Sequence, residues 1–412
     1  MTTPTQTRTV VRHARSGARG RTLASVALAL AAAIAGCRSV SRAPVADARV
    51  VDARATAETK ALFLNLQRLS ADRVLFGHQD PLAYGVEWTG DTNRSDVKDV
   101  TGSFPAVHGW DVSGLEKTSS RNIDGVPFGR MAQWITGAYR RGGVITISWH
   151  MNNPVSGGNA WDTTGAVAAI LPGGAKHALY RQWLDGFAAY AATLRAARPG
   201  TLDEQPVPIV FRPFHEMSGG WFWWGAGHCT PAEYTALWRF TVTYLRDTKQ
   251  VHNLLWAYAP NAQPDGALDR YFAYYPGDEF VDILGIDDYS TLERAAGGAD
   301  PVAAMRANLR WLAGQAMARG KVAALTEAGY VTIPDSTWWT GKLLPALAPD
   351  SGAAHVAYAL VWRNANRLHD RPDHFYAPYP GQASAADFVR FRADRRVLFE
   401  DELPDMYRAP ER

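Results

Sequence analysis

Two glutamates stand in local sequences suited to acid–base chemistry on a sugar. Glu216 follows the apolar run 207–214 and precedes two glycines and four consecutive aromatic residues, which would place a sugar-sized surface beside an acid. Glu327 follows a second apolar run, 321–326. Glycosidic cleavage requires two facing carboxylates: one protonates the leaving oxygen, and the other stabilises or captures the oxocarbenium-like centre. Either glutamate alone would be interpreted as a surface residue or a salt-bridge partner, so the inference depends on the pair.

The residues around Glu216 lack the spacing of a zinc protease site. An H-E-x-x-H motif starting at His215 would need histidine at position 219, which is Gly219. No phosphate-binding or metal-binding motif is found in the sequence, so neither a metal nor another cofactor is expected. The chain has 15 tryptophans, about three times average usage. Because the C–H faces of sugar rings pack on indole, this excess favours a carbohydrate site, although about half of these residues are expected in the core.

Short apolar runs alternate along the chain with stretches of helical periodicity. The expected strands are residues 73–77, 105–110, 143–149, 207–214, 253–258, 281–287, 321–326 and 356–362. The expected helices are a leading one at 56–70, followed by 129–141, 177–196, 231–248, 301–319 and 337–347. This alternation predicts an α/β fold, a (β/α)8 TIM barrel with a single catalytic domain, better than a doubly wound sheet.

Several expected strands end in polar or aromatic residues. In a (β/α)8 barrel the carboxyl ends of the strands face the active site, so reactive residues gathered there indicate a site rather than packing. Glu216 and Glu327 would end the fourth and seventh strands, on opposing parts of the rim, where they can face each other. Arg212 lies four residues before Glu216 on the same strand face, so it is expected to point inward and to tune a carboxylate.

The N-terminus has the pattern of an export signal. Residues 1–36 contain five arginines and no acidic residue, and the apolar run 23–36 is too short for a comfortable membrane-spanning helix. The formal net charge of +3 depends on these arginines, so the rest of the chain is close to neutral and offers no basic face for nucleic acid. No nucleic-acid partner is therefore expected.

The apolar run ends at Cys37, in a sequence that resembles the lipobox of bacterial lipoproteins. This resemblance predicts a lipoprotein signal peptide at 1–36, lipidation of Cys37, a polar tether at 37–55 and the barrel domain at 56–412. The alternative is a plain secretory signal with an incidental cysteine. The predicted location is the bacterial envelope, with the outer membrane favoured because Arg38, not aspartate, follows the cysteine. Membrane contact is expected only through the lipid. Cys229 then has no disulfide partner and is expected to be an inert thiol.

Five strings together resemble glycoside hydrolase family 26, whose members are mostly endo-β-1,4-mannanases. They are FGHQDPLAYG (76–85), SWHMNNP (148–154), RPFHEMSGGWFWWG (212–225), LTEAGY (325–330) and VWRNA (361–365). The strings occur in the family's order and extend over about residues 75–365. The resemblance implies a (β/α)8 barrel, a retaining mechanism, and β-mannan or manno-oligosaccharides as the substrate.

The resemblance also implies roles for particular residues. Glu216 corresponds to the acid/base and Glu327 to the nucleophile, with Tyr289 hydrogen-bonded to the nucleophile and holding it ionised. The residues expected to contact the sugars are His150, His215, Trp221, Trp362 and Arg363. Trp161 follows a glycine-rich loop, where stacking on a distal sugar and packing of the loop are equally good interpretations. Trp223 and Trp224 are expected to pack behind Trp221, since three adjacent indoles cannot all face one ring.

Alternative functions remain at this point. Within the family these are a mannobiose-releasing exo-type mannanase, a β-1,3-xylanase and a mixed-linkage glucanase, which the loop sequences do not distinguish. Outside catalysis, the chain could be a surface glycan-binding lipoprotein that has kept the barrel, although the presence of both glutamates counts against this. The protein is expected to be a monomer.

Overall fold

The computed structural model describes residues 49–262, 270–293, 298, 300–347 and 355–410. The expected signal peptide, Cys37 and the start of the expected tether lie outside the described residues. Within the described ranges, no helix combines the length and the hydropathy needed to cross a membrane.

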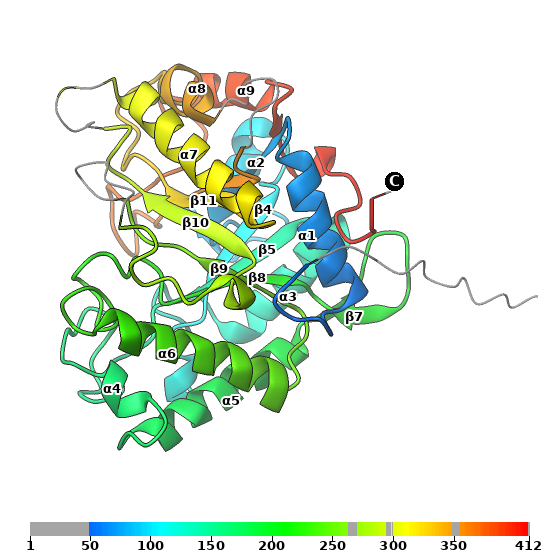
Figure 1. The fold of residues 1–412 in the computed structure, drawn as a ribbon. Helices are drawn as coiled ribbons and strands as arrows, with labels where there is room; N and C mark the ends of the chain where they lie inside the picture. The colour runs from blue at the N-terminus through cyan, green and yellow to red at the C-terminus, as the bar shows by residue number, and fades with distance from the viewer. Residues whose placement is uncertain (1–48, 263–269, 294–297, 299, 348–354, 411–412) are drawn as a thin grey trace, which may run out of the picture. The chain divides into compact units, whose positions relative to one another are not determined.

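Eight parallel strands form a closed barrel (Figure 1), as the sequence predicts. They are β1 (Val74–Gln79), β4 (Val107–Asp111), β5 (Val144–Trp149), β8 (Ile209–Pro213), β9 (Leu254–Tyr258), β10 (Ile283–Asp288), β11 (Val322–Ala328) and β12 (Tyr358–Val361). Each strand pairs with its neighbour in chain order, and β12 pairs with β1 from Leu75 opposite Tyr358 to His78 opposite Val361, which closes the sheet. All the carboxyl ends therefore meet at one end of the barrel.

Helices surround the barrel at the predicted places. The main ones are α1 (Ala57–Leu69), α3 (Phe128–Arg141), α5 (His177–Thr193), α6 (Pro231–Thr243), α7 (Pro301–Ala318) and α8 (Leu344–Leu347). π-helical turns at Tyr244–Thr248 and Trp339–Leu343 extend α6 and precede α8. Short additional elements are α2 (Asp96–Thr101), α4 (Val167–Ile170), 3-10 turns at Leu115–Lys117, Asp278–Phe280 and Glu400–Glu402, and the hairpins β2 (Tyr84–Gly85) with β3 (Trp88–Thr89) and β6 (Arg195–Ala197) with β7 (Glu204–Pro206).

Local sequence explains where α6 begins. The Thr230 hydroxyl oxygen accepts a hydrogen bond from the backbone N–H of Glu233, and the Glu233 carboxylate accepts one from the backbone N–H of Thr230. Pro231 occupies the first helical position. This capping box satisfies backbone donors that a helix otherwise leaves unpaired at its start. The helix therefore begins at the residue that the sequence predicts.

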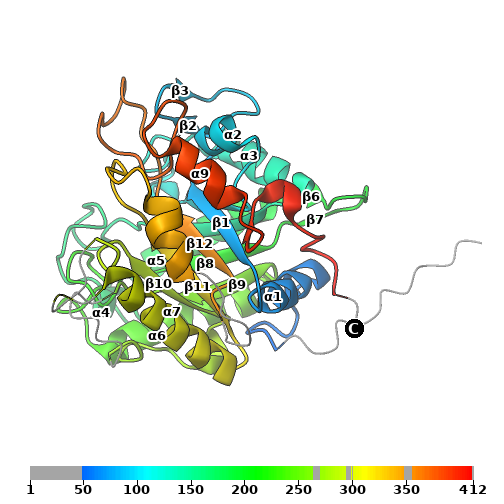
Figure 2. The same cartoon turned by 90° about the horizontal axis from the view of Figure 1, so that it is seen from above.

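The last part of the chain packs against β1. The C-terminal helix α9 (Ala385–Arg392), which the sequence analysis did not predict, lies against β1 (Figure 2), and the short strand β13 (Val397–Leu398) pairs with β1. The Phe76 ring on β1 lies 5.1 Å from both the Phe388 and Phe399 rings and 5.8 Å from Phe391. This aromatic cluster attaches the C-terminal segment to the barrel wall.

The packed domain begins before α1. The backbone N–H of Val51 donates to Asp282 Oδ1 at 2.7 Å, and Asp52 pairs with His252 Nδ1 at 2.6 Å. The last residues of the segment assigned to a tether at 37–55 thus contact the barrel, so the domain boundary lies earlier than residue 56. Asp282 and His252 lie just before strands β10 and β9. The segment with Val51 and Asp52 therefore packs at the end of the barrel opposite the carboxyl ends of the strands.

Candidate active site

Glu216 and Glu327 lie at the carboxyl ends of β8 and β11. A bend after β8 places Glu216: its φ is +55° and that of Phe214 is +50°, and its backbone N–H donates to Ala259 at 2.7 Å. Positive φ at residues other than glycine is strained backbone of a kind that gathers at functional sites. Glu327 lies within β11, where an irregular register with β10 sets it opposite Asp287. The two glutamates thus approach one another from different sides of the rim.

The distance between the carboxylates is short. One oxygen from each of Glu216, Glu327 and Asp287 lies within 4.8 Å of the others. Retaining glycosidases hold their two carboxyl groups about 5–5.5 Å apart, whereas inverting enzymes need about 6.5–9.5 Å to admit a water molecule. The spacing fits a direct attack on the sugar better than attack by an intervening water. The three carboxylates could also surround a cation, but Arg212 already forms ion pairs with two of them.

Two donors fix the Glu327 carboxylate. Arg212 forms an ion pair with Oε1, and the Tyr289 hydroxyl donates to Oε2 at 2.7 Å. Burial and the neighbouring Glu327 and Glu216 charges raise the pKa of Tyr289 well above its usual range, so the hydroxyl keeps its hydrogen. Arg212 also binds Asp287 at 2.7 Å. The inward Arg212 expected from the sequence is therefore present, and the carboxylate it contacts is Glu327.

Glu216 has a different environment. Burial, followed by the negative charge of Glu327, raises the pKa of Glu216 to about 7. Trp221 Nε1 donates to Glu216 Oε2 at 2.7 Å, which partly opposes this rise. A carboxyl group with such a pKa holds a proton for much of the time at neutral pH and can donate it to a leaving oxygen.

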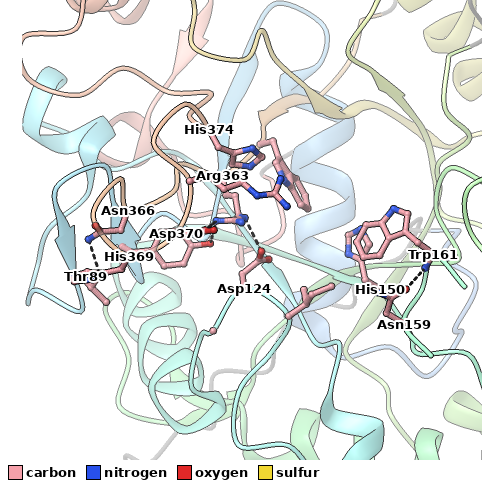
Figure 3. A pocket seen from close by; sticks show the side chains of 15 residues that line it. Thr89, Asp124, His150, Asn159, Trp161, Arg363, Asn366, His369, Asp370 and His374 are labelled. Carbon is pink, nitrogen blue, oxygen red and sulfur yellow. Dashed lines mark hydrogen bonds and ion pairs between the residues drawn. The ribbon is translucent and has the colours of Figure 1, made fainter. Parts of the chain in front are cut away.

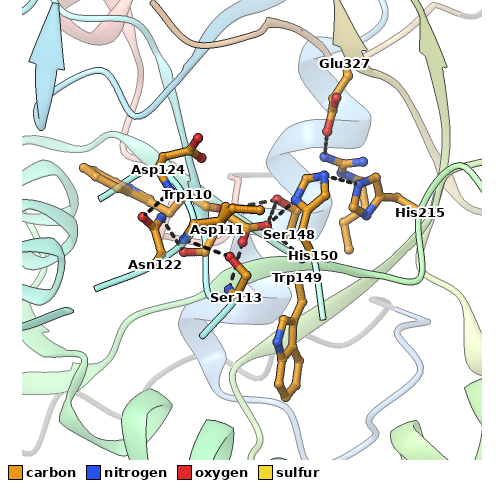
Figure 4. Close-up of polar contacts among 12 residues, drawn as sticks. Trp110, Asp111, Ser113, Asn122, Asp124, Ser148, Trp149, His150, His215 and Glu327 are labelled. Carbon is orange, nitrogen blue, oxygen red and sulfur yellow. Dashed lines mark hydrogen bonds and ion pairs between the residues drawn. The ribbon is translucent and has the colours of Figure 1, made fainter. Parts of the chain in front are cut away.

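His150 and His215 lie beside the carboxylates. His150 Nδ1 is 2.8 Å from Asp111 Oδ2, and the Nε2 atoms of the two histidines are 3.2 Å apart (Figure 4). The Trp161 ring stacks on His150, with centroids 5.3 Å apart and 17° between the planes. The two histidines thus form a connected polar pair on one wall of the site.

Two adjoining cavities form the cleft at this end of the barrel. The first, of about 260 Å³, is lined by both glutamates and by His150, Trp161, Trp221, Phe222, Tyr289, Glu293, Val331, Trp362, His374 and Tyr376. The second, of about 760 Å³, shares His150, Trp161, Trp362 and His374 with the first (Figure 3). Trp161 and Trp221 expose 46% and 40% of their surface, unlike the buried Trp223 and Trp224. Indole surface is therefore open to a ligand in the cleft.

Arg363 lines the larger cavity and is buried. Its guanidinium pairs with Asp124 at 2.7 Å and with Asp370 at 2.9 Å, and it lies 3.4 Å from the Tyr84 hydroxyl. Both acidic partners come from loops. Since each partner also lines the cavity, Arg363 is held in place by neighbours that themselves face the cleft.

The structure brings the predicted site residues together. Glu216, Glu327, His150, Trp161, Trp221, Tyr289 and Trp362 line the first cavity, Arg363 lines the second, and His215 contacts His150. Trp223 and Trp224 pack behind the wall and donate to the backbone oxygens of Met151 and His215. Burial raises the pKa of Cys229 to about 12, which keeps its thiol protonated and agrees with the inert thiol expected.

Several residues of the cleft follow no pattern that could be recognised in the sequence. Asp124, His374 and Tyr376 belong to loops and end no apolar run. Gly329 in the string LTEAGY is a sequence feature that could have indicated the position of Tyr376. Its φ is +142°, and a Cβ atom at this position would lie 2.4 Å from the Tyr376 ring. A glycine directly after a strand-end acid can thus mark the close approach of an aromatic residue from another loop.

Comparisons with known proteins agree with this geometry. The sequence model of glycosyl hydrolase family 26 matches residues 51–339. A mannan endo-1,4-beta-mannosidase of Bifidobacterium adolescentis is 36% identical over 378 residues, covering 88% of this chain and 36% of that protein. A mannan endo-1,4-beta-mannosidase of Bacillus subtilis is 27% identical over 270 residues, 62% of this chain and 72% of that protein. The chain thus spans about a third of the length of the Bifidobacterium relative.

Solved structures match over most of the chain. The GH26 beta-mannanase of Bacteroides ovatus has a TM-score of 0.78 and 40% identity, covering 85% of this chain and 97% of that one. The modular endo-beta-1,4-mannanase of Cellulomonas fimi has a TM-score of 0.76 and 40% identity, covering 88% of this chain and 80% of that one. These matches confirm the barrel and the resemblance drawn from the five strings.

Proposed function

Because the chain belongs to glycosyl hydrolase family 26, we propose that it hydrolyses β-1,4-mannosidic bonds within mannan and galactomannan chains, with retention of configuration. The observation that carries this proposal is the pair of carboxylates, Glu216 and Glu327, whose oxygens approach within 4.8 Å on the floor of an aromatic-walled cleft. The names of the relatives from Bifidobacterium and Bacillus support mannan as the substrate.

The reaction then proceeds in two steps. In the first, Glu327 attacks the anomeric carbon while Glu216 donates its proton to the leaving oxygen, giving a covalent mannosyl-enzyme. In the second, the Glu216 carboxylate takes a proton from water, which attacks the same carbon and releases the sugar with its original configuration. Arg212 and Tyr289 hold the Glu327 oxygens in line for the first step.

The substrate assignment is tested by a product profile on mannan, galactomannan, lichenan and β-1,3-xylan. We expect high activity on the two mannans and an early, steep fall in viscosity, because an endo-acting enzyme cuts within the polymer. Steady release of mannobiose with little change in viscosity would favour the exo-type alternative. Comparable specific activity on lichenan and mannan would contradict the substrate assignment.

The roles of the two glutamates are tested with alanine variants, an aryl mannoside with an activated leaving group, and azide. Glu216→Ala should still form the covalent intermediate, which azide attacks to give a β-mannosyl azide. In Glu327→Ala, azide replaces the missing nucleophile and gives an α-mannosyl azide. If Glu216→Ala gave the α-mannosyl azide and Glu327→Ala the β-mannosyl azide, the roles of the two glutamates would be reversed. Full activity in both variants would contradict the two-carboxylate mechanism, and mannan binding without cleavage by the wild type would indicate a glycan-binding protein.

We further propose that the protein is exported and anchored to the bacterial envelope through a lipid on Cys37. The sequence Ile34-Ala35-Gly36-Cys37 after an apolar run supports this. A tether that is attached to the domain at the end of the barrel opposite the cleft would also leave the cleft accessible to a polymer. Metabolic labelling with a clickable fatty acid should label the wild type and Cys229→Ser but not Cys37→Ser. Equal labelling of both variants would rule out this lipid site.

A further inference from the structure

A fully buried carboxylate, Asp111, lies behind His150 at the end of β4. Its Oδ2 lies 2.8 Å from His150 Nδ1, 3.1 Å from the backbone nitrogen of the same residue and 2.9 Å from Ser148 Oγ, while its Oδ1 accepts from the backbone of Ser113 at 2.8 Å (Figure 4). Burial alone would raise the pKa of Asp111, but the charge of His150 and these hydrogen bonds outweigh burial and lower it. Asp111 is thus an anion held in place by donors from the neighbouring strand β5, from His150 directly after it, and from the loop that follows β4.

This anion determines where the hydrogens of two histidine rings lie. A carboxylate only accepts hydrogen bonds, so the Nδ1 atom of His150 must carry a hydrogen. The Nε2 atom of a neutral His150 is then an acceptor, and His215 Nε2, 3.2 Å away, must donate to it. If His150 is instead protonated, its Nε2 donates and His215 accepts. In both states Asp111 fixes His150, and His150 fixes the tautomer of His215.

The charges around the pair favour protonation of His150 over protonation of His215. Burial lowers the pKa of His150, but the Asp111 charge and hydrogen bond raise it overall. Burial, Arg212 and the charge of His150 lower the pKa of His215 well below its usual range. The charged and titratable groups facing His150 are Asp111 from β4, Asp124 from the following loop, His215 beyond β8 and the two glutamates, and its other neighbours are Trp161, Phe222 and Trp362.

His150 itself lines both cavities of the cleft, whereas Asp111 lines neither. We propose that Asp111 is a positioning residue: through its bond to His150 Nδ1 it sets the tautomer and charge of the His150–His215 pair beside the cleaved sugar. The consequence for catalysis rests on the proposed function of the cleft, whereas the hydrogen positions do not.

The test compares Asp111→Asn with Asp387→Asn. Asparagine keeps the volume of Asp111 but removes the charge. Asp387 is an equally buried carboxylate on α9 that bonds to Thr340 and Arg390, outside the cleft. We expect Asp111→Asn to lower kcat/KM on mannan about tenfold or more, mainly through kcat, because misplacing a group beside the reacting centre can cost about 100-fold. Its pH profile should also change, whereas Asp387→Asn should alter only the Tm.

A double substitution separates a positioning role from a structural one. Because Asp111 acts through His150, adding Asp111→Asn to His150→Gln should cause no further loss of kcat/KM. A full additional loss in the double variant would overturn the proposal. So would an Asp111→Asn protein with a lowered Tm but the wild-type kcat/KM and pH profile.

Long-range ¹⁵N–¹H spectra of histidine-labelled wild-type protein provide a second measurement, which does not require the Asp111 variant to fold. His150→Gln identifies the signals of His150. We expect a hydrogen on His150 Nδ1 across the range of pH in which the protein is active, and finding only the Nε2–H tautomer would overturn the proposal. If the wild type cleaves no glycan, the proposed function fails while these spectra still decide the hydrogen positions.

Discussion

Replacing Trp221 with phenylalanine should move the alkaline limb of the kcat/KM profile to higher pH. Trp221 Nε1 donates to Glu216 Oε2 at 2.7 Å, and this bond stabilises the carboxylate form of a group whose pKa is about 7. Without the donor, Glu216 binds its proton more tightly. Since the first step of the proposed mechanism needs protonated Glu216, activity should persist to a higher pH.

The size of the effect follows from the exposure of the bond. A hydrogen bond to a charged group contributes about 1.5–3 kcal/mol when buried. Trp221 is 40% exposed, so solvent screening reduces this to about 1 kcal/mol. One unit of pKa corresponds to about 1.36 kcal/mol, so the alkaline limb of the profile should move to higher pH by somewhat less than one unit. Admitting water to Glu216 would act in the opposite direction, but phenylalanine keeps most of the apolar cover, so the lost bond dominates.

The assay measures kcat/KM on a soluble aryl mannobioside from pH 5 to about pH 9, since this ratio reports the ionisation of the free enzyme. Trp134→Phe is the matched control. Trp134 lies on helix α3, stacks on Trp110 and lines neither cavity. The control should keep the wild-type limb. An unchanged limb in Trp221→Phe would show that the bond does not control Glu216, and a limb at lower pH would show that hydration dominates.

Three further predictions concern the proposed nucleophile Glu327, the aromatic wall of the cleft and the aromatic cluster around Phe76. Tyr289→Phe removes one of the two donors to Glu327, so kcat with an activated aryl mannoside should fall about tenfold or more; an unchanged rate of glycosylation in stopped-flow measurements would contradict this role. Trp362→Ala should lower kcat/KM by more than about tenfold, and a smaller loss, under about 1.4 kcal/mol, would assign Trp362 to packing. Phe76→Ala should lower the free energy of unfolding by about 3–5 kcal/mol in urea titrations, because its ring fills the cluster with Phe388; a loss under about 1 kcal/mol would contradict the packing described.

The barrel could be predicted because its strands have a strong local signal. Each is a short apolar run that is buried on both faces, as in β8 (Ile209–Pro213). A loop follows each of these strands. Helix α9 (Ala385–Arg392) lacks such a signal. Its N-cap residue, Ser384, makes no capping hydrogen bond, and its buried Phe388 and Phe391 pack on Phe76, more than 300 residues earlier. Its stability comes from tertiary contacts that its own sequence does not reveal.

The same distinction applies to the cleft. Residues that end strands, such as Glu216 and Glu327, could be placed from the sequence because the barrel dictates where strand ends meet. Asp124 and His374 could not, because loop positions depend on contacts between distant segments. Asn364, for example, donates to Asp96 at 2.7 Å and to the backbone of Ala377 at 3.0 Å, and so fixes the loop that carries His374.

Arg212 is the residue for which local pattern and long-range structure must be combined. The sequence pattern predicts that Arg212 points inward on the strand face of Glu216. In the structure β8 ends at Pro213, before Glu216, and the inward guanidinium of Arg212 binds Glu327 and Asp287 across the barrel. One glutamate thus has a fixed positive charge and a tyrosine hydroxyl, while the other has a single indole donor and a pKa raised to about 7. Environments that separate two carboxyl groups assign the acid and the nucleophile. In the proposed mechanism, burial and the negative charge of Glu327 suit Glu216 to donate the proton, while Arg212 holds the carboxylate of Glu327.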